Sequence, residues 1–456
     1  MSVSIEMSAP SRPVAANDPS PQGQMLLRIL AILDQAEIPY CLLHGYEQYP
    51  QTIRSDVDLL IPAEYLPERL ARILNDNHKT IGGRAVQWFI DGAHFIVLAG
   101  RDEESGAPVL LQLHAATRYE MAGRVFFEAD EILKSRRRHN GFWVPAIDIE
   151  FACVLTNRIA KSDVTEDHAE RFSWLYSRDR KACEAQIGRL FPASSAAIII
   201  AAATGEWEPV RNSISSLRAE LLASPASKPC GSGNLIGKLA RWLRPQNGFH
   251  AVFLGPDGVG KSTTIEAFQR DLSPAFLSEL YLTFAPGLLP QKFSPPKPKG
   301  PHSLPPRSLP ASLLKAAWWL VCYTLGYFLT IHPTLARGGL VVNHRYLVDA
   351  IVDQKRYRYR GPVWLLKFIW AVAPKPDVVF LLDAPAEVIQ SRKQEVSFAE
   401  TEAQIESYRG VIGTLPIGKI IDASQPRPKV AVEVEWIVLD RLADRVAKRF
   451  SLRGGK

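Results

Sequence analysis

The stretch AVFLGPDGVGKSTTIEAF, residues Ala251–Phe268, decides the fold of the second half of this chain. Its residues Gly255, Gly260, Lys261 and Ser262 satisfy the pattern G-x-x-x-x-G-K-[ST]. An apolar strand precedes the loop and a helix-forming run follows it, which is the context that a phosphate-binding loop needs. The sequence therefore predicts a strand, a loop that cradles phosphate and a helix, in that order.

Each part of such a loop has a physical role. Glycines let the backbone turn its N–H groups toward phosphate oxygens, and the start of the helix adds positive potential. Lys261 neutralises charge on the β- and γ-phosphates of ATP, and the Ser262 hydroxyl can ligate Mg²⁺. The residues expected to bind ATP follow one another: Gly255, Pro256, Asp257, Gly258, Val259, Gly260, Lys261, Ser262 and Thr263.

Three more apolar strands follow the loop, at Gly339–Asn343, Asp377–Pro385 and Lys419–Ser424, and helical sequence separates them. Continuous apolar strands that alternate with helices are typical of an α/β domain with a parallel sheet covered on both faces. Ligands of such sheets bind at the carboxyl ends of the strands. The groups expected there are Asn343, His344, Arg345, Asp383 and the loop after Asp422.

The segment from about Gly248 to Arg449 resembles the thymidylate kinase group of P-loop nucleotide kinases. Four pieces carry the resemblance: GPDGVGKST, NHRYLVDA, KPDVVFLLDAPAEVIQSRKQE and IIDASQP. The resemblance implies a kinase that uses ATP and Mg²⁺. Its catalytic residues would be Lys261 in the loop, Asp257 facing the acceptor, Arg345 gripping the acceptor phosphate, and Arg392 as the lid arginine.

Two departures concern the acceptor. His344 stands where the group has an acid, and Asp349 and Asp257 are the nearby substitutes. A proline-rich, basic segment replaces the group's acceptor-recognition run, with nine of the chain's 34 prolines between Pro286 and Pro310. The implied acceptor is a nucleoside monophosphate such as dTMP, or a related small phosphorylated or sugar acceptor.

An earlier segment, CLLHGYEQYPQTIRSDVDLLIP, places Asp56 and Asp58 two residues apart on a predicted strand after Gly45. Side chains repeat every two residues along a strand, so both carboxylates emerge on one face and could share a divalent metal. The segment resembles the G-x(n)-D-x-D signature of the nucleotidyltransferase superfamily, which implies an α/β domain over roughly Gln24–Thr204. The strand expected to supply a third acid has His114 instead, which we interpret as a core histidine.

Composition sets the frame for these motifs. With 456 residues, 46% of them hydrophobic, the chain is long enough for two folded domains. We expect a disordered tail (1–22), a nucleotidyltransferase-like domain (23–205), a linker with an entry helix (206–245) and a thymidylate kinase-like P-loop domain (246–450). Five scattered cysteines indicate a reducing, cytoplasmic compartment. The net charge of +7 suits an anionic small-molecule partner, and we expect no nucleic acid.

The apolar run Ala316–Ile331 is short for a membrane span. We interpret it as a buried helix or as the contact of a homodimer, with membrane contact as the alternative. In the resembled kinases the helix before the arginine-bearing strand packs at a subunit interface.

Three functions stay open from the sequence. The first is Mg-ATP-dependent phosphorylation of the acceptor described above. The second is metal-dependent nucleotidyl transfer at Asp56 and Asp58, with the P-loop domain regulatory. The third is a non-enzymatic, ATP-gated binding protein.

Overall fold

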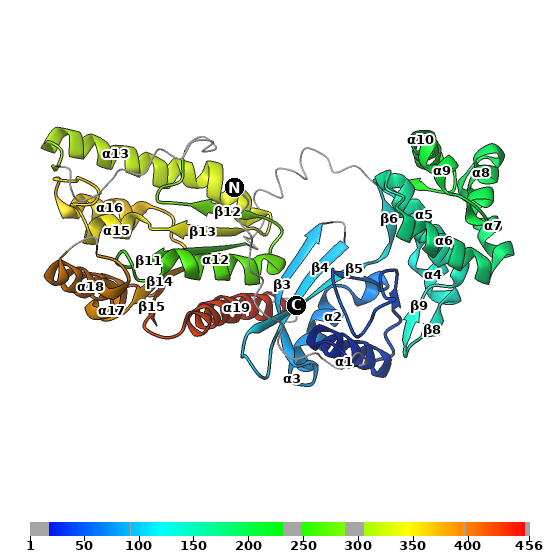
Figure 1. Cartoon of the computed structure of the whole chain (residues 1–456), viewed down its shortest axis with the longest axis horizontal. Coiled ribbons are helices and arrows are strands. Elements are labelled where there is room, and N and C mark those ends of the chain that lie inside the picture. Colours follow the sequence, from blue (N-terminus) through cyan, green and yellow to red (C-terminus); the bar gives the residue numbers. More distant parts are fainter. Residues whose placement is uncertain (1–17, 92, 231–247, 288–304, 395–396, 452–456) are drawn as a thin grey trace. The chain divides into compact units, whose positions relative to one another are not determined.

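In the computed structural model the described residues are 18–91, 93–230, 248–287, 305–394 and 397–451. The chain divides into two compact units, which Figure 1 shows coloured along the sequence. Unit 1 consists of Met1–Asp102, Val109–Ser232 and Val446–Lys456, and unit 2 of Glu103–Pro108 and Gly233–Arg445. All five cysteines are free thiols.

Unit 2 is built on a parallel sheet. In the described part of the chain its order is β12-β13-β11-β14-β15, with β11 at the centre, and every neighbouring pair is parallel. The strands are β11 (Phe249–Leu254), β12 (Glu279–Leu282), β13 (Leu340–His344), β14 (Val378–Asp383) and β15 (Gly418–Asp422). The expected parallel sheet is therefore confirmed, and the three strands predicted after the loop are β13, β14 and β15.

Helices pack on both faces of this sheet. Alternate residues of β11 point to opposite faces, so Val252 and Leu254 share a buried cluster with Tyr323 of a long apolar helix, α13. Phe253 points the other way and meets Phe268 of α12, with ring centroids 5.3 Å apart. The helices are α12 (Lys261–Leu272), α13 (Leu309–Gly326), α14 (His332–Ala336), α15 (Leu347–Val352), α16 (Val363–Val372), α17 (Ala386–Arg392), α18 (Phe398–Gly413) and α19 (Arg427–Ser451), with short turns η2 (Ser273–Ala275) and η3 (Tyr327–Ile331).

Unit 1 contains a mixed sheet. The order is β1-β2-β5-β4-β3; β2 and β5 are parallel, whereas β1 with β2 and β3 with β4 are antiparallel. Helix α1 packs its apolar side chains into the cluster that covers this sheet. The elements are α1 (Pro21–Gln35), β1 (Cys41–Leu42), β2 (Val57–Leu60), η1 (Ala63–Tyr65), α2 (Glu68–Asp76), α3 (His78–Ile81), β3 (Gly83–Asp91), β4 (Ala93–Arg101) and β5 (Pro108–Ala116).

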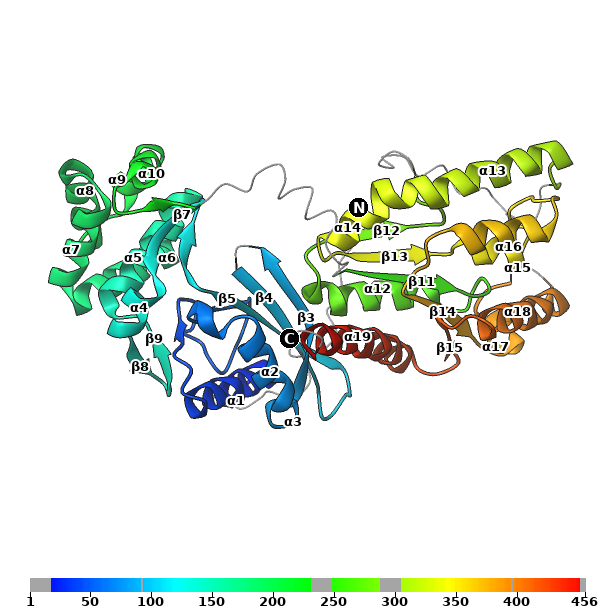
Figure 2. The same cartoon turned by 180° about the vertical axis from the view of Figure 1, so that it is seen from behind.

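The rest of unit 1 is mostly helical. Helices α5 to α10 gather beside a small sheet of order β10-β7-β6 (Figure 2). Their apolar side chains form one buried cluster. The elements are β6 (Arg118–Met121), β7 (Arg124–Glu128), α4 (Ala129–Ser135), β8 (Arg137–His139), β9 (Phe142–Val144), α5 (Ile147–Lys161), α6 (Glu166–Arg178), α7 (Arg180–Leu190), α8 (Ala193–Ala203), α9 (Glu208–Asn212), α10 (Ile214–Ala223) and β10 (Lys228–Pro229).

The boundary expected at residue 205 differs from the structure, because unit 1 continues through α9, α10 and β10. Leu217 and Leu221 of α10 are buried in its core. Arg124 donates to the Ser227 carbonyl at 2.7 Å and so fastens a stretch whose small polar composition reads as a linker. The chain is also helical from Pro21, inside the expected tail. The expected entry helix and most of the proline-rich segment lie outside the described residues.

Candidate functional site

The loop between β11 and α12 has the backbone that a phosphate cradle needs. Gly255, Gly258 and Gly260 have φ values of +138°, +88° and +111°, a region that side chains with a Cβ rarely adopt. The loop also has no room for a side chain at position 255, since a Cβ on Gly255 would come within 2.6 Å of the Leu382 carbonyl oxygen. Helix α12 begins directly after the loop at Lys261, so its free N–H groups and positive end face the loop. This cradle fits a triphosphate.

Lys261 is only 5% exposed. Its ammonium donates to the carbonyl oxygens of Gly255 at 2.8 Å and Pro256 at 2.7 Å. Burial, together with the positive charge of Arg345, lowers its pKa to about 7, and the Asp257 carboxylate 3.8 Å away opposes that shift. The lysine is therefore held within the loop, where an additional negative charge would stabilise its ammonium form.

Arg345 follows β13 and faces the loop. Its two terminal nitrogens bind two carboxylates: Nη1 contacts both oxygens of Asp349, at 3.0 and 2.8 Å, and Nη2 donates to Asp257. Its backbone adopts φ +79°, which costs a non-glycine residue about 1–2 kcal/mol, and its N–H donates to the Phe253 carbonyl at 3.0 Å. Strained residues held on all sides in this way are concentrated at functional sites.

Sequence reasoning missed three partners in this cluster. Arg356 donates to the second oxygen of Asp257, and the hydroxyls of Tyr357 and Tyr408 donate to the buried Asp349 carboxylate. Burial tends to raise the pKa of Asp349, but the charge of Arg345 and these donors outweigh it and keep the pKa low. The signal in the sequence was the run DQKRYRYRGP, which contains Arg356 and Tyr357 but does not say which of its cations turns inward.

His344 ends β13 beside this cluster. Burial, helped by the positive charges of Lys261 and Arg345, lowers its pKa to about 4. The imidazole therefore stays neutral at physiological pH. Its Nε2 is buried without a hydrogen-bond partner in the described part of the chain. At the position where the sequence analysis notes an acid in the resembled kinases, this chain thus has a neutral group that can donate or accept a hydrogen bond.

The remaining predicted residues, Arg392, Ser262 and Thr263, also belong to or contact the loop and the helix after it. Arg392 ends α17 and donates to the carbonyls of Val259 at 3.2 Å and Ala423 at 3.1 Å, so it joins the loop to the segment after β15. Ser262 and Thr263 lie in the first turn of α12. The structure thus brings Lys261, Asp257 and Arg345 into direct contact and places Arg392 against the same loop from the far side.

The lowered pKa of Lys261 leads to a testable prediction. At pH 8 the free lysine is mostly neutral, because its pKa is about 7. A bound triphosphate favours the ammonium form, so ATP binding at pH 8 should take up close to one proton, and clearly less at pH 6. Calorimetric titrations in Tris and in HEPES measure this uptake as a buffer-dependent heat. A heat of binding that is the same in both buffers at pH 8 would contradict the prediction.

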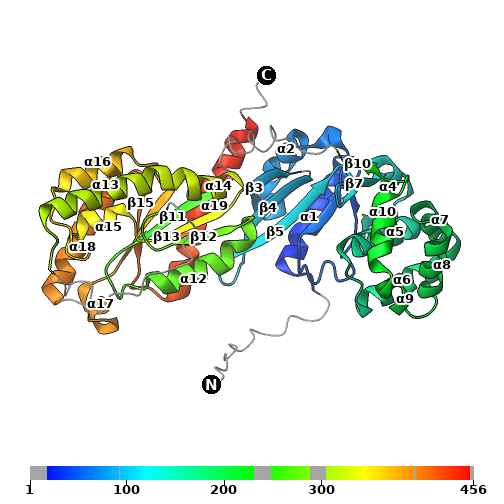
Figure 3. The same ribbon diagram turned by 90° about the horizontal axis from the view of Figure 1, so that it is seen from above.

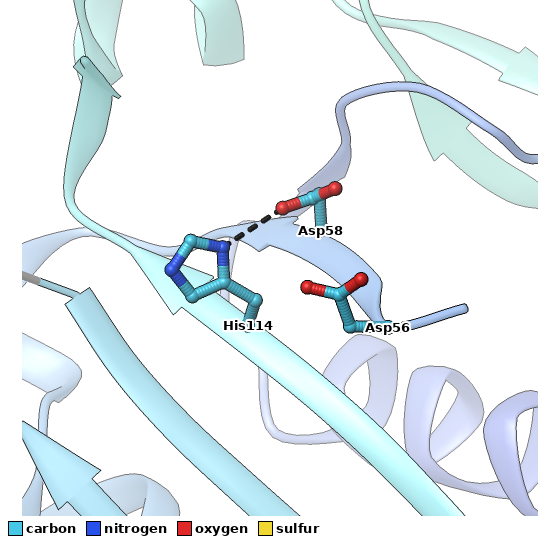
Figure 4. A group of neighbouring side chains, drawn as sticks. All are labelled: Asp56, Asp58 and His114. Carbon is cyan, nitrogen blue, oxygen red and sulfur yellow. Dashed lines mark hydrogen bonds and ion pairs between the residues drawn. The ribbon is translucent and has the colours of Figure 1, made fainter. Parts of the chain in front are cut away.

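A second cluster lies in unit 1, in a cavity of about 1050 Å³. Asp56 precedes β2, Asp58 lies on β2, and His114 lies on the parallel neighbour β5, in register with Asp58. Figure 4 shows the three side chains converging, and one ligand atom from each lies within 4.8 Å of the others. The two carboxylates therefore lie close together in one cavity.

The expectation for His114 was wrong. Its side chain is 40% exposed and lines the cavity instead of packing in the core. The neighbouring residues Leu113 and Ala115 lie on the opposite face of β5, and that face packs in the core. Its Nδ1 lies 2.9 Å from Asp58 Oδ1. This hydrogen bond raises the pKa of His114. Burial tends to raise the pKa of Asp58, but the bond from His114 and the charge of His44 outweigh it, so the net shift is downward.

Tyr46, which follows Gly45, packs in the buried cluster that covers the mixed sheet of unit 1. Its ring is 1% exposed and its hydroxyl donates to the buried Glu150 carboxylate, which Arg137 also binds at 3.0 Å. The tyrosine next to Gly45 is therefore held in place by a buried hydrogen bond.

Comparison with known proteins gives a partial likeness. No family model matches the chain. A thymidylate kinase of Xanthomonas oryzae pv. oryzae (strain PXO99A) is 32% identical over 127 residues, which is 26% of this chain and 53% of the relative. A thymidylate kinase of Leuconostoc citreum (strain KM20) is 25% identical over 211 residues, 42% of this chain and 96% of the relative. The chain thus spans about half the length of the first of these relatives.

Solved structures also match part of the chain, and one of them is a thymidylate kinase from Ehrlichia chaffeensis. It is 16% identical, covers 42% of this chain and 100% of its own, and superposes with a TM-score of 0.29. Part of this chain is therefore similar in sequence to thymidylate kinases, at low identity.

Proposed function

We propose that unit 2 is an ATP-dependent kinase that phosphorylates a small acceptor bearing a phosphate, namely a nucleoside monophosphate such as dTMP. The observation that carries the proposal is the cluster in which Arg345 and Arg356 hold Asp257 beside the loop lysine. With Lys261 protonated, three cations (Lys261, Arg345 and Arg356) face two anions (Asp257 and Asp349), which leaves one positive charge. Such a surplus in a partly buried site favours an anionic ligand.

Phosphoryl transfer mainly requires alignment of the two reactants and neutralisation of charge on the transferred group. The loop N–H groups and Lys261 would hold the β- and γ-phosphates of ATP. Mg²⁺, which the Ser262 hydroxyl would help to hold, supplies charge neutralisation between those phosphates. Arg345, fixed by Asp349, would direct the acceptor phosphate, and Arg392 would close the nucleotide side.

Asp257 is bound by two guanidinium groups, so its role differs from that of a general base. An anion shared by two arginines orients both of them, and this holds their remaining N–H groups in fixed directions. We propose that Asp257 sets the spacing between the loop and the acceptor, and that an incoming acceptor phosphate competes with it for Arg345 and Arg356.

An ADP-release screen on the full chain tests the proposed function. We expect Mg-dependent ADP release that a nucleoside monophosphate stimulates, whereas the matching nucleoside, free sugars and sugar phosphates do not. ATP binding without stimulation by any nucleoside monophosphate would overturn the kinase proposal and favour the ATP-gated binding protein. Stimulation by a sugar phosphate alone would keep the kinase and replace the acceptor.

An exposed apolar face of unit 2 supports the proposed homodimer. Helices α13 and α16 lie side by side (Figure 3). The exposed apolar side chains on them and on η3 include Leu314, Trp318, Val321, Leu325, Phe328, Leu329, Trp364, Phe368 and Val372. By length and composition the helix Leu309–Ala336 could also cross a membrane, with a mean hydropathy of 1.3. We propose that a second copy covers the face and that the protein works in the cytoplasm.

The oligomeric state of the full chain, measured by sedimentation, tests this proposal. The wild type should sediment as a dimer and Leu325→Glu as a monomer, because one buried charge in the contact costs several kcal/mol. A wild type that sediments as a monomer and floats with liposomes would show that lipid covers the face instead.

A further inference from the structure

The cavity of unit 1 is lined both by a group of potential metal ligands and by cationic side chains. On one side lies the Asp56, Asp58 and His114 cluster. Cationic side chains line the same cavity: Arg118, Arg158, Lys161 and Arg171. At about 1050 Å³ the cavity exceeds the usual range for a small-molecule site, so it has room for a nucleotide-sized ligand.

The cluster presents ligand atoms of two types. Asp56 and Asp58 offer carboxylate oxygens, and His114 offers a ring nitrogen held 2.9 Å from Asp58. Carboxylates alone suit Mg²⁺ and Mn²⁺, whereas an imidazole nitrogen favours later first-row transition metals such as Zn²⁺. Because β2 and β5 are hydrogen-bonded neighbours, Asp58 and His114 come from rigid elements, as good metal sites require.

A second histidine supports the same carboxylate. Nδ1 of His44 lies 3.4 Å from Oδ2 of Asp58, the oxygen that His114 does not contact. Groups that hold a metal ligand from behind fix its orientation and strengthen binding. His44 is therefore placed as a positioning residue for Asp58.

The cations of the cavity differ in how far they are already neutralised. Arg171 binds Glu150 and Glu47, and Arg118 binds Glu120. Lys161 is the last residue of α5 and lines the cavity that contains Asp58. Arg158 has a carboxylate partner, Asp163, at 3.5 Å, and its Nε is buried without a hydrogen-bond partner among the described residues. Lys161 is thus the cation best placed to bind the oxygens of a phosphate beside the metal, and Arg158 is the next.

We propose that this cavity is a second ligand site, in which Asp56, Asp58 and His114 hold a divalent transition metal and Lys161 and Arg158 bind the polyphosphate that the metal carries. The site needs no kinase activity in unit 2. It involves binding only, and its preference for a metal that accepts nitrogen follows from His114.

Electron spin echo spectroscopy of Mn²⁺ bound to the full chain tests the metal site. The probe is Mn²⁺ alone, added to a chain that also carries Lys261→Met, so that the loop of unit 2 binds little. We expect modulation from a directly bound ¹⁴N nucleus, which disappears in His114→Ala. Calorimetry should show Zn²⁺ bound at least about tenfold more tightly than Mg²⁺. His78→Ala, in the same unit but outside the cavity, is the matched control and should change neither result.

Inorganic tripolyphosphate, added with Mn²⁺ to the same chain, probes the phosphate wall. Lys161→Gln should weaken its binding about tenfold or more, while binding of Mn²⁺ alone stays unchanged; Lys134→Gln, on the exposed side of α4, is the control. Absence of ¹⁴N modulation in a folded wild type, or its survival in His114→Ala, would overturn the metal site. Equal tripolyphosphate binding by Lys161→Gln and the parent chain would overturn the ligand assignment. Neither result depends on whether unit 2 is a kinase.

Discussion

Replacing Lys261 with methionine is expected to lower ADP release by about 10²–10³-fold, the usual loss when one charge-stabilising donor is removed from a site of this kind. The ammonium is fixed by the carbonyls of Gly255 and Pro256 and faces the phosphate cradle. Methionine has nearly the same length and no charge, so the cradle keeps its shape but loses the cation. ATP binding, measured by calorimetry, should weaken together with turnover.

The melting temperature separates this effect from unfolding. A buried ammonium is costly, as the lowered pKa of about 7 shows, and methionine removes that cost while filling the same space. We therefore expect a melting temperature within about 5 °C of the wild type. Lys355→Met is the control, because that side chain is 79% exposed and pairs with Glu400 on the surface; it should keep full activity. A Lys261→Met chain with wild-type turnover would refute the kinase proposal.

The loop and the sheet could be predicted from sequence because each depends on local signals. The glycines at 255, 258 and 260 adopt φ values that few other residues tolerate, so their spacing reports the backbone directly. The strands β13 and β14 are buried on both faces and leave uninterrupted apolar runs. Their parallel direction in the sheet then follows from alternation with helices.

The partners of Asp257 and Asp349 could not be predicted in the same way. Arg356 and Tyr357 lie about 100 residues after the loop, in a run where several cations and tyrosines alternate. Which of them turns inward depends on the turn Asp353–Tyr359, where Asp353 accepts from the Arg356 N–H at 3.0 Å. Tyr408 comes from α18, still further along the chain. Only tertiary packing brings these groups together.

His114 shows how an apolar pattern can mislead. Its strand reads LLQLHAA, and every second residue is buried, so the alternation itself was visible. What the sequence did not show was that the other face of β5 lines a cavity next to β2. The register between these strands, whose paired residues Asp58 and His114 are 56 positions apart, depends on the tertiary fold. A histidine on the open face of such a strand is available as a ligand.

The second large effect concerns stability. We expect Asp349→Ala to destabilise unit 2 by about 3–5 kcal/mol, the usual cost of breaking a buried ion pair by removing one partner. Asp349 is 0% exposed and accepts hydrogen bonds from Arg345, Tyr357 and Tyr408. Its loss leaves the guanidinium of Arg345 buried with fewer partners and leaves two hydroxyls without an acceptor. Urea unfolding followed by tryptophan fluorescence measures the change.

The pH dependence of the same carboxylate has a defined sign. The folded pKa of Asp349 is lower than that of an unfolded aspartate, so its stabilising contribution is present above the unfolded pKa and disappears as the pH falls toward the folded one. The destabilisation caused by Asp349→Ala should therefore be largest near neutral pH and shrink in acid. A difference that grows on acidification would contradict this assignment.

A double variant distinguishes a broken charge pair from a simple cavity. In Asp349→Leu with Arg345→Met the uncompensated charge is gone, and apolar side chains fill much of the space, so the double variant should be more stable than Asp349→Ala alone. Asp257 keeps Arg356 as a partner in that background. Glu402→Ala, an exposed position on α18, should change stability by less than about 0.5 kcal/mol. If the double variant instead lost as much unfolding free energy as its two single changes added together, Asp349 would stabilise the unit through packing. That result would contradict its assignment as the anchor of Arg345.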